Sequence, residues 1–177
     1  MNLNAEIRHK SAIQAPLNPN IKVAVKDFAM SIADKYPVAL TLTIKQTQRI
    51  KNANGVFVKK VNEQDCEWIA KRFTQKLNRE VFGKRGAEKY GKALKYFAVV
   101  EGGGYTGKNL HLHMAIGNLP AHVKMEELDD LVSRAKQYVE GVDEQHVVAM
   151  ATDCGWIDYI TKEVSKSNSD AVLWRLA

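Results

Sequence analysis

The sequence predicts an α+β fold, built on an antiparallel-rich sheet with helices packed on one face. Three observations lead to this class. The chain of 177 residues is long enough for a single domain with its own core. Short segments in which every second residue is apolar alternate with longer segments whose apolar residues keep helical spacing. The order of these segments, β-α-β-β-α-β-α, is typical of helices packed on an antiparallel sheet.

The chain begins with a polar stretch that lacks either pattern. Residues 1–20 contain two prolines, and we expect them to form a flexible arm in front of a single domain at 21–177. A short helix is expected at 21–35, ended by Tyr36-Pro37. The first strand follows at 38–45, VALTLTIK, where the apolar residues alternate with two threonines.

The longest helical pattern begins at Asn62 and runs to about Asn78. Its apolar residues recur every three to four positions, while Lys71 and Arg72 belong to the polar surface. A basic loop with three glycines is expected next, at 83–95. This loop either contacts a polyanion or is a solvated connection, and its cations are Lys84, Arg85, Lys89, Lys92 and Lys95.

Five further elements complete the fold. Strands are expected at 94–101, 110–117 and 145–152, because apolar residues alternate there or run continuously. An amphipathic helix is expected at 125–140 and a last helix at 156–166. The two middle strands follow each other directly and are joined by a glycine-rich turn.

That turn partly matches a phosphate-binding loop. Gly102, four residues and then Gly107-Lys108 fit the start of G-x-x-x-x-G-K-[ST]. Asn109, however, stands where a Ser or Thr would bind Mg²⁺, and a strand pattern follows where a helix would be needed. We therefore expect no ATP binding.

The same segment favours a metal site instead. His111 and His113 are two residues apart on a strand and therefore point the same way. Nine residues separate Glu101 from His111, an odd number that lets the two pair directly across a hairpin. Thr41 and Thr43 also lie on the non-apolar face of their strand. Two imidazoles and a carboxylate make a plausible divalent-metal site; two solvated histidines are the alternative.

The last helix carries a possible nucleophile. Tyr159, Lys162 and Glu163 share one face of this helix because they are three and four residues apart. A cation one turn from a tyrosine favours the phenolate or neutralises a phosphate. An ordinary surface tyrosine on an amphipathic helix is the other interpretation.

The overall composition indicates the class of partner and the compartment. The formal charge is +6 and the pI about 9.2, which favours a polyanion such as nucleic acid. The two cysteines form no paired framework, the start has no apolar signal region, and no run of about 18 apolar residues occurs. We expect a cytoplasmic protein, in a bacterial, archaeal or virus-infected cell, with no membrane association.

Taken together, these motifs resemble the HUH endonucleases, in particular the single-tyrosine Rep proteins that initiate rolling-circle replication. LTLT (40–43) resembles the first motif of the family, HLHMAI (111–116) the second and YITK (159–162) the third. Glu101 stands where Rep proteins place a third metal ligand. The resemblance covers roughly 70% of the chain, from Leu40 to Lys162.

The resemblance implies a five-stranded, ferredoxin- or RRM-like antiparallel sheet with flanking helices. It also implies Mg²⁺- or Mn²⁺-dependent nicking of single-stranded DNA, at an origin hairpin or nick site, through a 5′-phosphotyrosine intermediate. Glu101, His111 and His113 would hold the metal, Tyr159 would attack and Lys162 would assist. Host helicase is a further implied partner. The DNA-backbone contacts are expected at Lys71, Arg72, Lys84, Arg85, Lys89 and Lys92.

Other functions fit some of the same residues. Compact HUH transposases of the insertion-sequence type often place a polar ligand four residues after the tyrosine, as Glu163 is here. No second tyrosine follows Tyr159 on its turn, which departs from the two-tyrosine Rep proteins. A non-catalytic nucleic-acid-binding module would bind without metal, and a mononuclear iron oxygenase would use the same two histidines and carboxylate.

Overall fold

The computed structural model describes residues 19–53, 55–103, 108–151, 155–162, 164 and 171–176. Its main sheet is antiparallel, with the strand order β4-β5-β1-β6. The first three predicted strands are confirmed within one residue at each end, and the last begins three residues earlier than expected. The strands are Val38–Ile44 (β1), Lys95–Glu101 (β4), His111–Gly117 (β5) and Val142–Met150 (β6).

The expectation of five strands in this sheet is not met among the described residues. The free edge of β4 carries only an isolated antiparallel bridge, between Val99 and Val172. One backbone hydrogen bond supports it, from Leu173 N to Ala98 O (2.9 Å). The C-terminal segment therefore covers part of the edge at which a fifth strand would lie.

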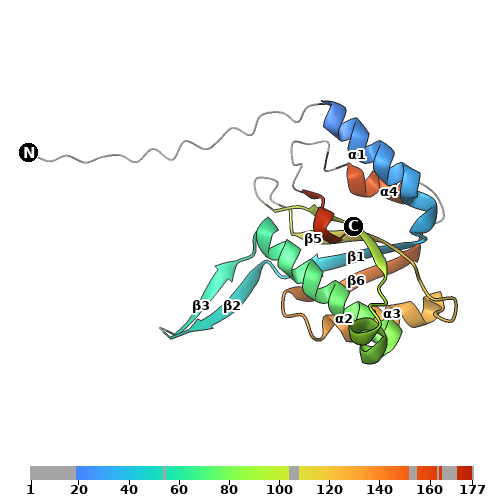
Figure 1. Cartoon of the computed structure of the whole chain (residues 1–177). Helices are drawn as coiled ribbons and strands as arrows, with labels where there is room; N and C mark the ends of the chain where they lie inside the picture. The colour runs from blue at the N-terminus through green and yellow to red at the C-terminus, as the bar shows by residue number, and fades with distance from the viewer. Residues whose placement is uncertain are drawn as a thin grey trace, which may run out of the picture.

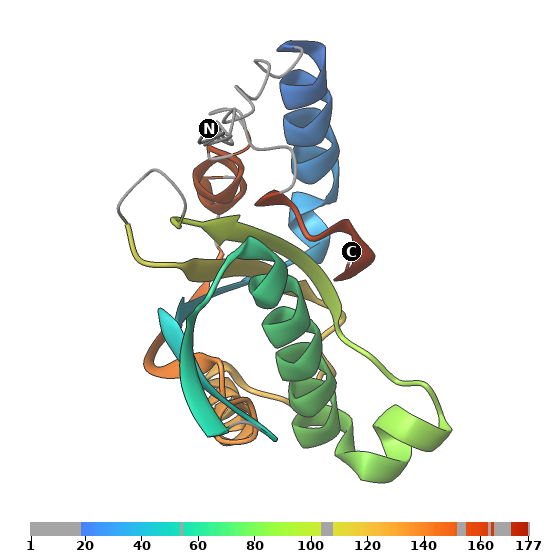
Figure 2. The same ribbon diagram turned by 90° about the vertical axis from the view of Figure 1, so that its left-hand side faces the viewer.

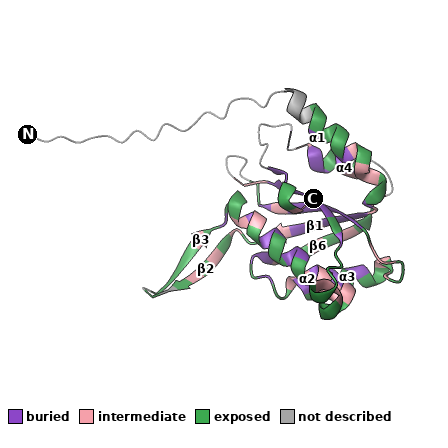
Figure 3. Ribbon diagram, in the orientation of Figure 1, coloured by how far each residue is buried: buried purple, intermediate pink, exposed green. Residues whose placement is uncertain are grey.

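Helices cover both faces of the sheet, which corrects the expectation of one covered face (Figure 1). Helices α2 (Glu63–Lys89) and α3 (Met125–Lys136) pack on one face, and α1 (Pro19–Ile32) and α4 (Gly155–Thr161) on the other. The cause is the strand sequences, because β4 and β5 are apolar at successive positions and are buried on both sides (Figure 3). Neither face of these strands is solvated along its whole length.

Helix α2 extends through most of the predicted basic loop at 83–95. Its start is capped by Asn62, whose side chain accepts from the backbone N–H of Asp65 (2.9 Å). A kink at Gly83, with φ of 70°, divides the helix, and residues 84–89 continue as a short second segment. A positive φ is readily adopted by glycine, so the glycine bends this helix and does not end it.

A two-stranded hairpin that was not expected from the sequence patterns projects from the body of the protein (Figures 1 and 2). It consists of β2 (Thr47–Asn52) and β3 (Gly55–Lys60), paired from Thr47–Lys60 to Asn52–Gly55. Asn-Gly at 54–55, between two alternating segments, was the available signal. That signal is weak because alternation here separates polar from apolar residues poorly.

Two helices end earlier than expected. Helix α3 stops at Lys136, so Tyr138, expected on its buried stripe, is 63% exposed. Helix α4 stops at Thr161, and most of 163–170 lies outside the described residues. The predicted arm at 1–20 also lies outside them, except for Pro19 and Asn20, which begin α1. Among the helices that the structure describes, none is long and apolar enough to cross a membrane.

Candidate active site

The strand register brings the predicted ligands together at one end of the sheet. Glu101 pairs directly with His111, as the odd spacing predicted. On the other side of β5, Thr41 lies opposite His113 and Thr43 opposite His111. All five side chains therefore share the face on which α1 and α4 pack.

The glycines after β4 serve a tight backbone turn. Gly102 and Gly103 have φ of 91° and 77°. A Cβ on Gly102 would lie 2.0 Å from the carbonyl oxygen of Asn109, so a side chain has no room there. Gly103 N donates to Lys108 O (3.0 Å), and β5 begins soon afterwards. A strand, not a phosphate-binding helix, follows Lys108.

Glu101 and His113 form a buried pair at the centre of this site. Glu101 is 7% exposed and His113 5%, and His113 Nε2 lies 2.7 Å from Glu101 Oε2. Burial raises the pKa of Glu101, but hydrogen bonds from His113 and Lys162 outweigh it and hold that pKa below its usual value. Burial lowers the pKa of His113, against the effect of Glu101. The site thus combines a carboxylate with a neutral imidazole.

Thr41 holds the other nitrogen of that imidazole. Its Oγ1 lies 3.0 Å from His113 Nδ1. Because a carboxylate only accepts, Nε2 carries the ring proton toward Glu101, and Nδ1 accepts from the Thr41 hydroxyl. A hydroxyl can also accept, so Thr41 can equally satisfy the opposite tautomer, in which Nε2 is free to bind a cation.

Helix α4 places the candidate nucleophile beside this pair. The Tyr159 hydroxyl lies 3.5 Å from Glu101 Oε2, and its ring packs edge-on against His113, with 5.3 Å between centroids. The Lys162 ammonium lies 3.4 Å from the Tyr159 ring centroid and 3.2 Å from Glu101 Oε1. Tyr159 is 43% exposed, so an incoming substrate can reach it. Glu163, the alternative ligand, lies outside the described residues.

Two residues of the site were not assigned to it from the sequence. Trp156 stacks on Tyr159 (5.5 Å between centroids, 13° between planes) and donates from Nε1 to Met114 O (3.3 Å). Lys108 Nζ lies 3.5 Å from Glu101 Oε1. The position of Trp156, three residues before Tyr159 on one helix, was a usable signal. Nothing local in the sequence relates Lys108 to Glu101.

A shallow groove adjoins Tyr159 on the sheet. It has a volume of about 350 Å³, and its walls are Trp156 and Tyr159. Its floor is made of small side chains from β1 and β6, namely Ala39, Thr41, Val147 and Ala149. An aromatic wall beside an apolar floor can accept a flat aromatic group such as a nucleobase.

The ligand set agrees with metal binding in its chemistry more than in its present geometry. A carboxylate, a neutral imidazole and a second histidine 6.2 Å from the first, measured between ring centroids, are suitable donors for a divalent ion. Nevertheless, no group of three or more His, Cys, Asp or Glu side chains in the described part of the chain is arranged to hold a metal. Glu101 is already bonded to His113 and Lys162, so a cation would have to replace these contacts.

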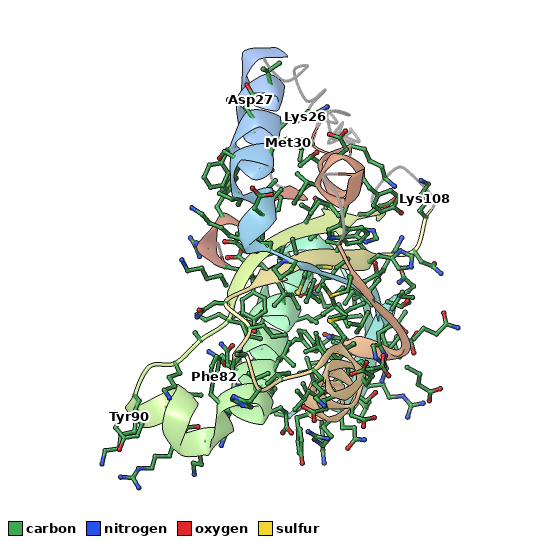
Figure 4. The ribbon with its side chains drawn as sticks, turned by 90° about the vertical axis from the view of Figure 1, so that its right-hand side faces the viewer. Lys26, Asp27, Met30, Phe82, Tyr90 and Lys108 are labelled. Atoms are coloured by element: carbon green, nitrogen blue, oxygen red, sulfur yellow. The ribbon has the colours of Figure 1, made fainter. Side chains whose placement is uncertain are left out.

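The predicted DNA-backbone cations lie away from this site. Lys84, Arg85, Lys89 and Lys92 are exposed and surround the end of α2; Arg85 and Lys89 lie over the ring of Tyr90, at 5.5 and 5.9 Å. Figure 4 shows Tyr90 and Lys108 at opposite ends of the molecule. Lys71 and Arg72 are exposed on α2, which packs on the other face of the sheet.

Comparison with known proteins identifies a family. A family model described as a replication-associated protein, of the ORF2 type, matches residues 37–168, about three quarters of the chain. The match begins just before β1 and includes Glu101, both histidines, Tyr159 and Lys162. No curated protein and no solved structure matches the chain. The chain therefore belongs to this family of replication-associated proteins, a membership that points to a role in the initiation of DNA replication.

Proposed function

We propose that the protein nicks and rejoins single-stranded DNA through a phosphotyrosine intermediate, and so starts rolling-circle replication. The observation that carries this proposal is the convergence at Glu101. An exposed tyrosine hydroxyl, a lysine ammonium and a buried histidine, from α4, the residue after it and β5, all lie within 3.5 Å of its carboxylate oxygens. The replication-associated family supports the same activity, since an initiator of rolling-circle replication must open a strand.

In the proposed reaction Tyr159 Oη attacks a phosphorus atom of the DNA. A bond from oxygen to phosphorus forms, the bond from phosphorus to the 3′ oxygen breaks, and the phenol proton is balanced by protonation of the leaving 3′-OH. The ammonium of Lys162, against the ring, stabilises charge on the phenolate or on the phosphate. The phosphotyrosine retains the energy of the phosphodiester, so the strand can be rejoined without ATP.

Glu101, His111 and His113 would hold a Mg²⁺ or Mn²⁺ ion. When bound, the ion would polarise the scissile phosphate. The groove between Trp156 and β6 would receive a base next to the scissile bond, with Trp156 keeping the Tyr159 ring in place.

The test is covalent capture. The protein is incubated with a pool of single-stranded oligonucleotides and Mn²⁺, and an adduct that survives SDS is sought. A shifted band that requires both Mn²⁺ and single strands supports the proposal. If no oligonucleotide in a pool of broad sequence coverage is captured, while the protein still binds single strands, the protein is a non-catalytic binding module.

Thr41→Val is expected to weaken Mn²⁺ affinity by about 10- to 100-fold, as loss of a hydrogen bond to a metal-binding histidine typically does. Valine keeps the shape of threonine but cannot satisfy His113 Nδ1. Thr41→Ser retains the hydroxyl and should bind Mn²⁺ nearly as well as wild type. Isothermal calorimetry distinguishes the two, and equal affinities in both variants would exclude the role assigned to Thr41.

Neutralising Lys84, Arg85, Lys89 and Lys92 to glutamine is expected to weaken the association with single-stranded DNA but not the chemical step. Each lost phosphate contact should flatten the slope of log affinity against log salt by about 0.7. Because the segment lies far from Tyr159, the nicking rate at saturating DNA should stay unchanged. An unchanged salt slope would show that these cations only make the surface polar.

A further inference from the structure

The β2–β3 hairpin is an exposed ribbon with two different faces. Directly paired residues point to the same side of a hairpin, so one face carries Thr47, Arg49, Lys51, Val56, Val58 and Lys60. We call this the outer face. All six residues are exposed. On the inner face, Gln48, Ile50 and Lys59 are half-buried, and Lys59 bonds to Asp65 of α2 (2.7 Å). The inner face is tied to the body, and the outer face is open to solvent.

The ribbon holds much of the positive charge of the protein. Residues 47–60 include five cations and no Asp or Glu, a charge of +5 in a chain whose net charge is +6; the cations are Arg49, Lys51, Lys59 and Lys60 together with none other than these four on the paired strands.

The count in the preceding paragraph is wrong and is replaced here: residues 47–60 include four cations, Arg49, Lys51, Lys59 and Lys60, and no Asp or Glu, a charge of +4 in a chain whose net charge is +6. Three of these cations, Arg49, Lys51 and Lys60, are on the outer face. The fourth, Lys59, is paired with Asp65. The outer face is therefore complementary to a polyanion.

The outer face leads toward the candidate active site. Lys60, its last residue, lines a pocket of about 650 Å³ together with Gln46 and Lys108. Lys108 in turn lies 3.5 Å from Glu101. Figure 2 shows the ribbon leaving the body near the start of α2, at the end of the sheet where β4 and β5 are joined. A strand bound at Tyr159 can thus continue over Lys108 and Lys60 onto the ribbon.

The side chains favour double-stranded over single-stranded DNA on this face. Proteins that grip single strands stack bases on aromatic rings, and the outer face has none, because Phe57 points to the inner side. A two-stranded ribbon fits the major groove, which is about 12 Å wide. Six residues per strand extend about 20 Å, which corresponds to about six base pairs at about 3.4 Å each.

We propose that the outer face of the β2–β3 ribbon binds the major groove of a duplex segment, such as a hairpin stem, next to the nick site. Arg49, Lys51 and Lys60 contact phosphates or base edges, and Val56 and Val58 contact thymine methyl groups. This proposal rests on the proposed function for the identity of the neighbouring site, and its test needs no nicking.

The test measures binding of a fluorescent duplex of mixed sequence, about 20 base pairs long, in EDTA, at several salt concentrations. The double variant Arg49→Gln/Lys51→Gln should flatten the slope of log affinity against log salt by about 1.8, or about 0.9 per phosphate contact. The matched control, Lys35→Gln/Lys95→Gln, removes the same charge from exposed positions at the other end of the sheet and should keep the wild-type slope. Equal slopes for the two variants would overturn the proposal.

A second pair of variants tests the face. Val58→Asp places a carboxylate opposite Arg49, whereas Phe57→Asp places it one residue away on the inner face. Both positions are exposed, and thermal unfolding checks that both variants are folded. Val58→Asp should weaken duplex binding severalfold more than Phe57→Asp. The same loss in both, or a loss limited to a single-stranded oligonucleotide of equal length, would contradict the proposal. Because the assay contains no metal, its result is independent of whether a DNA adduct forms.

Discussion

Tyr159→Phe is expected to form no covalent adduct with DNA, the largest effect of any single substitution in this protein. The variant lacks the one oxygen that would bond to phosphorus. Binding of single-stranded DNA and of Mn²⁺ should stay close to wild type, because the ring and its contacts with Trp156 and Lys162 remain. Tyr159 is 43% exposed, so the free energy of unfolding should change by less than about 0.5 kcal/mol.

The experiment compares adduct formation by gel after SDS treatment, with Tyr138→Phe as the matched control. Tyr138 is also exposed, but it lies just after α3, with Lys76 over its ring. Tyr138→Phe should form adduct at the wild-type rate. Mass spectrometry of the wild-type adduct adds a direct assignment. A peptide modified at Tyr105, or full nicking by Tyr159→Phe, would show that another tyrosine attacks. Tyr96 is a poor candidate because it is buried and donates to Asn78 Oδ1 (2.9 Å).

His111→Ala combined with His113→Ala is expected to abolish Mn²⁺ binding and metal-dependent nicking. Both imidazoles are proposed ligands, and the remaining carboxylate cannot hold the ion alone at micromolar metal. His111→Ala should hardly affect stability, because that side chain is partly exposed. His113→Ala removes a partner of buried Glu101 and should cost about 1–3 kcal/mol. The single variants therefore separate a loss of metal from a loss of fold.

Calorimetry with Mn²⁺ is the measurement, and His122→Ala is the control. His122 is exposed, near α3, so its loss should leave the affinity unchanged. Undiminished Mn²⁺ binding in the double histidine variant would remove these residues from the metal site. Glu101→Gln and Glu163→Gln then identify the third ligand. A larger loss for Glu101→Gln supports the Rep-like arrangement, and a larger loss for Glu163→Gln the transposase-like one.

The local patterns of the sequence were enough to place the candidate catalytic side chains on their elements. The period of two in HLHMAI put both histidines on one face, and the odd loop length put Glu101 opposite His111, as observed. Both conclusions follow from the geometry of a hairpin, in which parity decides the face. By the corresponding rule for helices, Tyr159 and Lys162, three residues apart, were expected together and lie in contact.

The tertiary structure alone decided how far the face around these residues is open and what else reaches it. The sequence patterns predicted an open face, yet α1 and α4 cover part of it, because β4 and β5 are apolar on both sides. Lys108 reaches Glu101 through the return of a turn, and the basic end of α2 lies far from Tyr159 because the helix continues past Gly83. These arrangements depend on contacts between segments distant in the chain, and no periodicity within one segment records them.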